Sequence, residues 1–442
     1  MKNIKSERGQ ALIILALAAI GIFGIVGLAI DGSAKFSDRR HAQNAADSAA
    51  LAGALALVNG QTTEIDGVQV WVLDALNRAL ENGYDDSHTT NDVWVYRCHE
   101  VDVDSPVDCG PYNGNPDYVQ VAIQSRVNTY FARVLGIDET VNTVHAVTYA
   151  KKRGPFYDGN LIVALNPNPC SGSSGNIVLG GSSTINLSGG GVFVNSGGSD
   201  CGLEQHGCPS ITFTDGGIGT SGGEGSVNWD EGCEPVGATE PAYNSDPYAF
   251  PPEMPAEPDE CTSPAGSWSS NSSTQITTLN PGRYNEFPPK STVAVTVYDN
   301  VFMNPGIYCV NDVVKLTDNH LVLVGHDVTI YIRSGYKFSI QGGTIDLDAP
   351  DDGPYAGYLI IVDSDFSGPV PDCFINGNST NTYVGTIFAP YCDLTVDGGS
   401  DATSYPAQMI AYTVAIQGTA ETNLYYDENV SAENQPKIGL MR

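Results

Sequence analysis

The chain has 442 residues, enough for two or three domains with their own hydrophobic cores. It carries 20 Lys and Arg against 51 Asp and Glu, which gives a formal net charge of −31. A surface this acidic repels phosphate groups, so nucleic acid and anionic lipid headgroups are excluded as partners.

Residues 11–30 form an uncharged apolar run, ALIILALAAIGIFGIVGLAI. A helix of this length spans about 30 Å, the thickness of the hydrocarbon core of a bilayer. The apolar region of a cleavable signal peptide has only about 7–15 residues, and no A-x-A cleavage site follows promptly. We therefore predict a retained transmembrane helix after a short cytoplasmic tail, residues 1–10.

The orientation of this helix follows from the remainder of the chain. Basic residues stand on both sides of the run, so the positive-inside rule does not decide it. The acidic charge and the cysteines, all of which lie beyond residue 97, favour a cytoplasmic N-terminus with the bulk of the chain outside. The basic residues are Lys2, Lys5, Arg8, Lys35, Arg39 and Arg40.

Small residues recur in the run and beyond it. Gly21, Gly24 and Gly27 occupy every third position, and small residues let a second membrane helix approach closely. We predict helix packing at these glycines; the alternative is that glycine is simply common in membrane helices.

Residues 34–58 are dominated by alanine, the strongest helix former, and Asn59-Gly60 provides a C-terminal stop. We predict a helix that either extends the membrane helix as a rod or packs on a sheet. Its small side chains, among them Ala45, Ala46 and Ala49, allow close packing in either arrangement.

Four features follow one another in the first 60 residues: Arg8-Gly9-Gln10, the apolar run ending at Asp31, the stretch from Arg39 to Asp47, and Ala49 to Ala54. Their order and spacing resemble the N-terminal segment of TadG/TadE-like proteins of Flp (Tad) pilus assembly. Residues 129–137, TYFARVLGI, are similar to the stretch that closes the membrane-proximal domain of that family. The resemblance implies a structural role, with other pilus or envelope assembly proteins as partners.

One position departs from the pattern of proteins cut by the prepilin peptidase. Such proteins usually carry Glu at the fifth position after the cleaved Gly, whereas the fifth residue after Gly9 is Ile14. We therefore expect the run to stay in the mature protein as an anchor.

Residues 31–150 read as a small membrane-proximal α/β domain. Apolar residues recur at helical spacing over 68–80, and 93–103, 118–127 and 140–150 alternate apolar and polar residues as strands do. The alternation predicts a sheet with one face covered by the Ala-rich helix. Residues 151–156 then read as a linker.

Residues 157–432 are predicted to be mainly β. Short apolar strings end repeatedly in Gly, and the last three such strings start about 20 residues apart, which is typical of a solenoid. A right-handed parallel β-helix is the prediction and a β-sandwich the alternative. Prolines between 241 and 258 predict a long surface loop, pinned by Cys233 and Cys261. Residues 433–442 are expected to form a C-terminal tail.

An even number of cysteines, all in the distal part, predicts structural disulfides formed in an oxidising compartment. Sequence neighbours favour Cys98–Cys109 and Cys373–Cys392. The alternative is zinc at Cys201, His206 and Cys208. The ten disulfide candidates are Cys98, Cys109, Cys170, Cys201, Cys208, Cys233, Cys261, Cys309, Cys373 and Cys392.

Acidic pairs on predicted strands raise the question of catalysis. Asp346 and Asp348 share one face of a strand, and Asp363 and Asp365 form a similar pair. Paired carboxylates can hydrolyse glycosidic bonds, but acids at alternate positions are also the ordinary solvent face of a strand. We predict no catalytic residue, no cofactor and no enzyme activity. The nearby charged groups weighed were His326 within Gly325-His326-Asp327, Lys315, Arg333 and Lys337.

Calcium is a second ion that the sequence leaves as an alternative, at Asp348, Asp351 and Asp352, in a spacing that matches no EF-hand or RTX loop.

Together these features predict a single-pass membrane protein with an extracytoplasmic structural role in a Tad/Flp-type pilus assembly or surface adhesion apparatus. The alternative is a membrane-tethered carbohydrate-active enzyme (a glycoside hydrolase or lyase) or glycan-binding protein on a β-helix scaffold, for which a surface glycan would be the partner.

Overall fold

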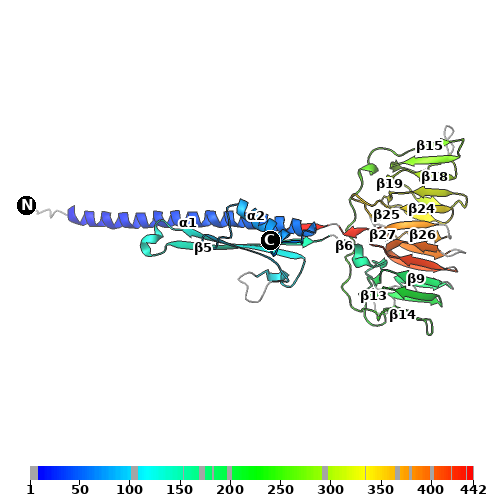
Figure 1. The fold of residues 1–442 in the computed structure, drawn as a ribbon, viewed down its shortest axis with the longest axis horizontal. Helices are drawn as coiled ribbons and strands as arrows, with labels where there is room; N and C mark the ends of the chain where they lie inside the picture. The colour runs from blue at the N-terminus through cyan, green and yellow to red at the C-terminus, as the bar shows by residue number, and fades with distance from the viewer. Residues whose placement is uncertain are drawn as a thin grey trace, which may run out of the picture. The chain divides into compact units, whose positions relative to one another are not determined.

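The structure is a computed structural model that divides the chain into two units (Figure 1). Unit 1 contains residues 1–154 and 435–442, and unit 2 contains residues 155–434, so the chain passes between the units twice. The residues described are 8–100, 108–152, 154–168, 175–181, 184–196, 202–290, 297–333, 335–363, 369–377, 381–398, 403–419, 421–434 and 436–441.

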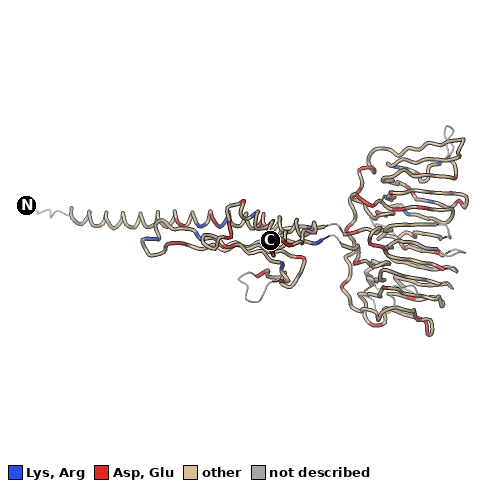
Figure 2. The backbone as a smooth tube through the Cα atoms, in the orientation of Figure 1, with Lys and Arg blue, Asp and Glu red and all other residues tan. Residues whose placement is uncertain are grey.

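Unit 1 is built on one continuous helix, α1 (Arg8–Val58), which is 51 residues long. An 18-residue window of α1 has a mean hydropathy of 2.9 and is only 6% buried, so by length and composition the helix can cross a membrane. Figure 2 shows no Lys, Arg, Asp or Glu on the tan stretch of α1 that begins after the grey residues and holds this window. The apolar run and the Ala-rich segment are therefore one helix, and Asp31-Gly32-Ser33 does not interrupt it.

The C-terminal half of α1 packs on an antiparallel sheet in the order β3 (Asn91–Arg97), β4 (Tyr118–Asn128), β5 (Glu139–Lys151) and β32 (Lys437–Met441). The other elements of unit 1 are β1 (Glu64–Ile65), β2 (Val68–Gln69), α2 (Val70–Glu81), and the 3₁₀ helices η1 (Gly110–Tyr112) and η2 (Ala132–Leu135).

The expected C-terminal tail, residues 433–442, instead contains β31 (Glu433–Asn434) and β32. Strand β32 pairs with β5 over five residues, from Lys437 opposite Lys151 to Met441 opposite Val147. An unpaired edge leaves backbone N–H and C=O groups without partners, and β32 satisfies those of β5. The expected linker, 151–156, likewise begins with the last residue of β5 and contains β6 (Gly154–Pro155).

The core cluster between the middle of α1 and the sheet is made of small side chains on the helix and mostly larger ones on the sheet. Ala45, Ala46 and Ala49 are all fully buried there. Gly53 also leaves little room for a side chain, because an added Cβ would lie 3.0 Å from the Cβ of Ala75 on α2. The helix therefore lies close to its neighbours, and the predicted packing of this segment on a sheet is what the structure shows. Other members of this core are Ala42, Ala50, Ala79, Val121, Ile123, Val144 and Ala146.

We expect Ala49→Leu to destabilise unit 1 by about 1–3 kcal/mol, because the added volume has no space between α1 and the sheet. Hydrogen exchange of the β4 and β5 amides in the full chain measures this as a loss of protection. Asn44→Leu, which places the same leucine side chain at an exposed position of this helix, is the control. Equal protection in the two variants would show that the packing is loose.

Unit 2 is mainly β, as predicted. It also contains the 3₁₀ helices η3 (Phe156–Gly159) and η4 (Asp259–Cys261). Its strands beyond β6 and β31 are β7 (Ile162–Ala164), β8 (Ile177–Gly181), β9 (Thr184–Ser188), β10 (Val192–Val194), β11 (Leu203–Gly207), β12 (Ser210–Thr214), β13 (Ile218–Thr220), β14 (Val227–Asn228), β15 (Ser267–Asn271), β16 (Ile276–Asn280), β17 (Gly282–Tyr284), β18 (Asn300–Met303), β19 (Gly306–Val310), β20 (Val314–Leu316), β21 (Val322–Gly325), β22 (Val328–Ile332), β23 (Phe338–Ile340), β24 (Thr344–Asp348), β25 (Tyr358–Val362), β26 (Asp372–Gly377), β27 (Thr382–Gly398), β28 (Thr403–Tyr405), β29 (Ala407–Gly418) and β30 (Thr422–Tyr425).

Parallel pairing dominates these strands. One ladder runs through β13, β10, β7, β29, β27, β25, β22, β19 and β17 in that spatial order. A second runs through β14, β11, β8, β29, β27, β26, β23 and β20. Two shorter ladders join β12, β9, β30 and β28, and β27, β24, β21, β18 and β16. Only β15 is added antiparallel, on β16, among the described strands of these ladders.

The Pro-rich segment 241–258 and the residues that follow it cross the first of these ladders, and we call residues 242–261 the strap. Ala242 bridges to β13, and the Tyr248 ring lies 4.6 Å from that of Phe193 on β10. Further along, the Phe250 ring lies 5.4 Å from that of Tyr412 on β29. The strap therefore meets the strands in their spatial order.

The second half of the strap is held by polar and covalent bonds. The Tyr355 hydroxyl donates to the carbonyl of Ala256 at 2.6 Å, and Arg333 Nε pairs with a carboxylate oxygen of Glu257 at 2.7 Å. Cys261 ends the strap in a disulfide with Cys309 on β19. Cys233 pairs with Cys208 instead, so the expectation that Cys233 and Cys261 pin the loop is correct only for Cys261.

Candidate functional site

The end of unit 1 that lies next to the apolar run is fixed by a carboxylate on α1. Asp31, the first residue after the run, accepts hydrogen bonds from the backbone N–H groups of Tyr130, Phe131 and Ala132, with shortest distances of 2.8, 3.0 and 2.7 Å. These bonds, that of Tyr130 foremost, lower the pKa of Asp31. Residues 129–137, singled out in the sequence, are thereby held against α1.

About two helical turns beyond Asp31, a second carboxylate ties α1 to the sheet. Asp38 accepts hydrogen bonds from Ser125 Oγ at 2.5 Å and from Asn142 Nδ2 at 2.7 Å. The Tyr84 hydroxyl donates to it at 3.3 Å, and burial with this carboxylate nearby raises the pKa of Tyr84. The sequence did not single out Asp38, because an acid on a helix with basic neighbours reads as solvent-facing.

The glycines predicted to pack helices fall into two kinds. Gly21 and Gly24 have no heavy atom within 4 Å of an added Cβ, so this side of the helix is open. At Gly27 an added Cβ would lie 2.7 Å from Cβ and Cγ of Phe131, so this glycine accommodates a side chain of the same chain.

Further along α1, Arg39 and Arg40 are exposed and form no ion pair with the residues that the structure describes.

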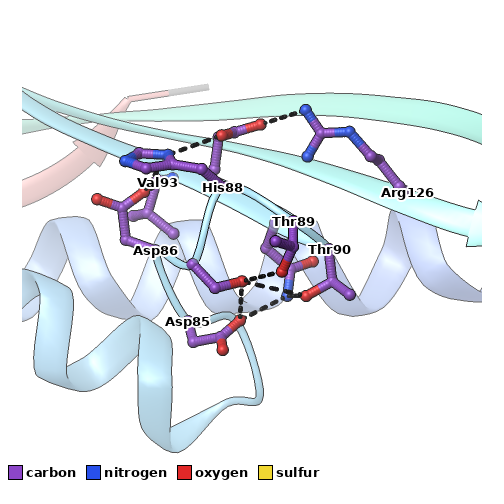
Figure 3. A network of polar contacts seen from close by, with 10 residues as sticks. Asp85, Asp86, His88, Thr89, Thr90, Val93 and Arg126 are labelled. Atoms are coloured by element: carbon purple, nitrogen blue, oxygen red, sulfur yellow. Dashed lines mark hydrogen bonds and ion pairs between the residues drawn. The ribbon is translucent and has the colours of Figure 1, made fainter.

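A polar cluster lies on the segment that leads into β3 (Figure 3). His88 Nδ1 lies 2.9 Å from a carboxylate oxygen of the buried Asp92, whose other oxygen accepts from Arg126 Nη2 at 2.7 Å. The hydrogen bond with Asp92 raises the pKa of His88, and the bonds with His88 and then Arg126 lower the pKa of Asp92. Asp86 caps the start of β3 by accepting from the Val93 N–H at 3.0 Å.

Ligand-type atoms of Asp86, His88 and Asp92 lie within 4.8 Å of one another, an arrangement that can hold a cation. Both oxygens of Asp92 are already engaged, by His88 and by Arg126. We therefore interpret the cluster as a structural ion-pair network that joins β3 to β4.

Four disulfides form among the described residues: Cys98–Cys109, Cys208–Cys233, Cys261–Cys309 and Cys373–Cys392. The two pairings favoured by sequence are confirmed. Zinc at Cys201, His206 and Cys208 is wrong for Cys208, whose sulfur is bonded to Cys233; His206 instead lies 3.3 Å from Glu204. Cys170 and Cys201 lie outside the described residues.

The acidic pair Asp346 and Asp348 occupies the outer face of β24. On β24, Ile345 and Leu347 are fully buried while Asp346 and Asp348 are partly exposed, which is the predicted alternation. Asp348 contacts His326 Nδ1 and accepts from the Asp327 N–H at 3.1 Å, and the contact with Asp348 raises the pKa of His326. Calcium at Asp348, Asp351 and Asp352 stays a prediction.

The other groups weighed for catalysis are partly engaged elsewhere. Asp363 accepts from the Tyr331 hydroxyl at 3.0 Å, and Asp365 lies outside the described residues. Arg333 is neutralised by Glu257 of the strap.

Comparison with known proteins identifies one segment. Residues 9–56 match a family model described as Tad, putative Flp pilus-assembly TadE/G-like. Neither a curated protein nor a solved structure matches the chain. The matched residues coincide with α1, and with the apolar run they support a membrane-anchored, pilus-related role.

We expect Asp31→Asn to release the backbone of residues 130–132, because a neutral amide oxygen accepts more weakly than a carboxylate. Amide exchange of these residues should become faster. In the wild type the bonds should persist above the ordinary carboxyl pKa of about 4 and be lost as the pH falls through the lowered pKa of Asp31. Asp47→Asn, whose carboxylate accepts from Gln43 on the same helix, is the control. Unchanged exchange in Asp31→Asn would contradict this role.

The His88–Asp92–Arg126 network predicts a pH window of stability for unit 1. The contribution of His88 is complete below about pH 6.5 and is lost as the pH rises through its raised pKa; that of Asp92 is complete above about pH 4 and is lost as the pH falls through its lowered pKa. Thermal unfolding of the full chain across this range should therefore show a loss above neutral pH that His88→Gln removes.

Asp92→Asn should destabilise unit 1 by about 1–3 kcal/mol, more than His88→Gln does, because it leaves the partly buried Arg126 without its carboxylate. Thermal unfolding at pH 5.5 compares the two variants. Equal losses would show that Arg126 does not depend on Asp92.

Proposed function

We propose that the chain is a membrane-anchored, extracytoplasmic structural component of a Tad/Flp-type pilus assembly or surface adhesion apparatus. The observation that carries the proposal is the continuity of α1. The segment that matches the pilus-assembly family is one helix that holds both the apolar run and the helical half of the core of unit 1. A movement of the apolar run of α1 in the membrane is therefore transmitted directly to the folded part of unit 1.

The orientation we propose has the N-terminus in the cytoplasm, with the part of unit 1 that follows the apolar run and the whole of unit 2 outside. The four disulfides support it, because all lie after the apolar run and structural disulfides form in oxidising compartments.

For unit 2 we propose a right-handed parallel β-solenoid. Paired residues in its ladders are separated by 22 positions between β18 and β21 (Asn300 opposite Val322) and by 26 between β8 and β11 (Ile177 opposite Leu203). Repeated parallel pairing at such intervals is typical of solenoids, whereas sandwiches are built from antiparallel strands. Its acidic outer surface would serve contact or adhesion, and the bulk charge argues against nucleic acid as the partner.

The second candidate is a carbohydrate-active enzyme or glycan-binding protein tethered to the membrane. The outward pair Asp346 and Asp348, with His326 beside Asp348, is the observation that favours it. We propose a non-enzymatic role without a cofactor, because the same pattern is expected of a solvated strand in a chain of this charge. Hydrolysis of a glycan panel that is lost in the double variant Asp346→Asn/Asp348→Asn, with folding intact, would favour the enzyme instead.

The main proposal is tested by complementing a deletion strain and purifying the full chain from gently solubilised membranes. Pilus components should co-purify with the wild type, and pili should be absent from the deletion strain. Gly24→Leu, on the open side of α1, should reduce co-purification, whereas Ala18→Leu places a leucine at another exposed position and serves as control. Normal pili after deletion, with no pilus component co-purified, would refute the assembly role.

A further inference from the structure

The connection between β4 and β5 lies against the last turn of the apolar run (Figure 1). The Phe131 side chain packs on Gly27, and the backbone of residues 130–132 is bonded to Asp31. At about 1.5 Å per residue, Gly27 lies about 4.5 Å inside the end of the run at Ile30. A bilayer that encloses the run therefore reaches this connection.

The same connection carries large apolar side chains that unit 1 does not bury. Val134 is 88% exposed, Leu135 82% and Tyr130 73%, while Phe131 and Ile137 are about half exposed. Five such residues within eight positions concentrate exposed apolar side chains on one loop, and monomeric proteins rarely leave large apolar patches in water.

The backbone holds these side chains outward instead of letting them collapse. Residues 132–135 form η2, which ends at Gly136 with φ +85°, a left-handed conformation that glycine adopts without strain. The Thr129 N–H donates to the carbonyl of Asp138 at 3.0 Å and closes the base of the loop. Arg133 Nε pairs with Asp138 at 3.1 Å, so the patch carries no unpaired charge.

We infer that residues 130–137 form an interface loop that inserts Val134 and Leu135 into the lipid beside α1, with Tyr130 at headgroup level. The inference rests on the proposed role of α1 as a membrane anchor. Lipid is the occupant because the loop is continuous with the apolar run through Phe131 and Gly27, and because tyrosine is favoured at membrane interfaces. The inserted side chains are uncharged and apolar, so their insertion requires no anionic lipid. Unit 1 then contacts the membrane at two points and is restrained from tilting about α1.

The test uses the full chain in nanodiscs of phosphatidylcholine, with an environment-sensitive nitrobenzoxadiazole probe on Val134→Cys. The control carries the probe on Asn59→Cys, an exposed position about 42 Å along the helix direction from Asp31. Lipid-borne spin labels should quench the probe at position 134 several-fold more than at 59, and aqueous iodide should show the reverse order. Leu135→Cys provides a second position if the first variant does not fold.

Equal quenching by iodide at positions 134 and 59, in protein that is incorporated in the discs, would overturn the interface loop and leave the anchor intact. Failure of the full chain to enter the discs would instead refute the anchor. Shielding at 134 in native membranes but not in pure lipid would show that another protein covers the loop, which also overturns the inference.

Discussion

The structure of unit 1 depends on the close approach of one alanine-covered helix to a four-stranded sheet. Side chains no larger than a methyl group at Ala45, Ala46 and Ala49 let α1 lie close to the sheet, where Val121 and Ile123 of β4 complete the core. Burial of alanine alone releases little free energy, since each methyl contributes about 0.8 kcal/mol. The large apolar side chains of the sheet and the carboxylates of Asp31 and Asp38 therefore supply much of what orients the helix.

Short-range patterns in the sequence predicted α1 and two strands of the sheet in unit 1. An uncharged run of twenty residues and an alanine-rich stretch are helical in almost any context, and alternation over 118–127 and 140–150 predicted β4 and β5. Cys98–Cys109 and Cys373–Cys392 could be paired because few residues separate them.

What depends on distant partners could not be predicted. The five residues of β32 carry no strong pattern, and their position is decided by the open edge of β5, which lies 286 positions earlier in the chain (Lys437 opposite Lys151). Cys261–Cys309 requires knowing that the strap reaches β19. The role of Asp38 is visible only once Ser125 and Asn142 are placed beside it, because a single acid on a helix gives no sign of burial.

In unit 2 the long strand β29 lies between β27 on one side and β7 and β8 on the other. The strands that come first in the chain thus complete their pairing only with residues near its end, which makes the fold dependent on contacts of high sequence separation. The two halves of the ladders become one sheet only after β29 is in place.

The strap gives these ladders a fixed length. A stack of repeats held only by contacts between neighbours can gain or lose a repeat anywhere, since each interface is equivalent to the next. Here the strap is tied to β13, β10 and β29 and finally to β19, and the seven steps between β13 and β19 at about 4.8 Å require it to cover about 34 Å. Insertion or deletion of a strand between those points would shift every later anchor of the strap against its strand. The strap therefore fixes the number of strands between β13 and β19. We expect relatives to change the size of this unit beyond β13 or beyond β19, and not between these two strands.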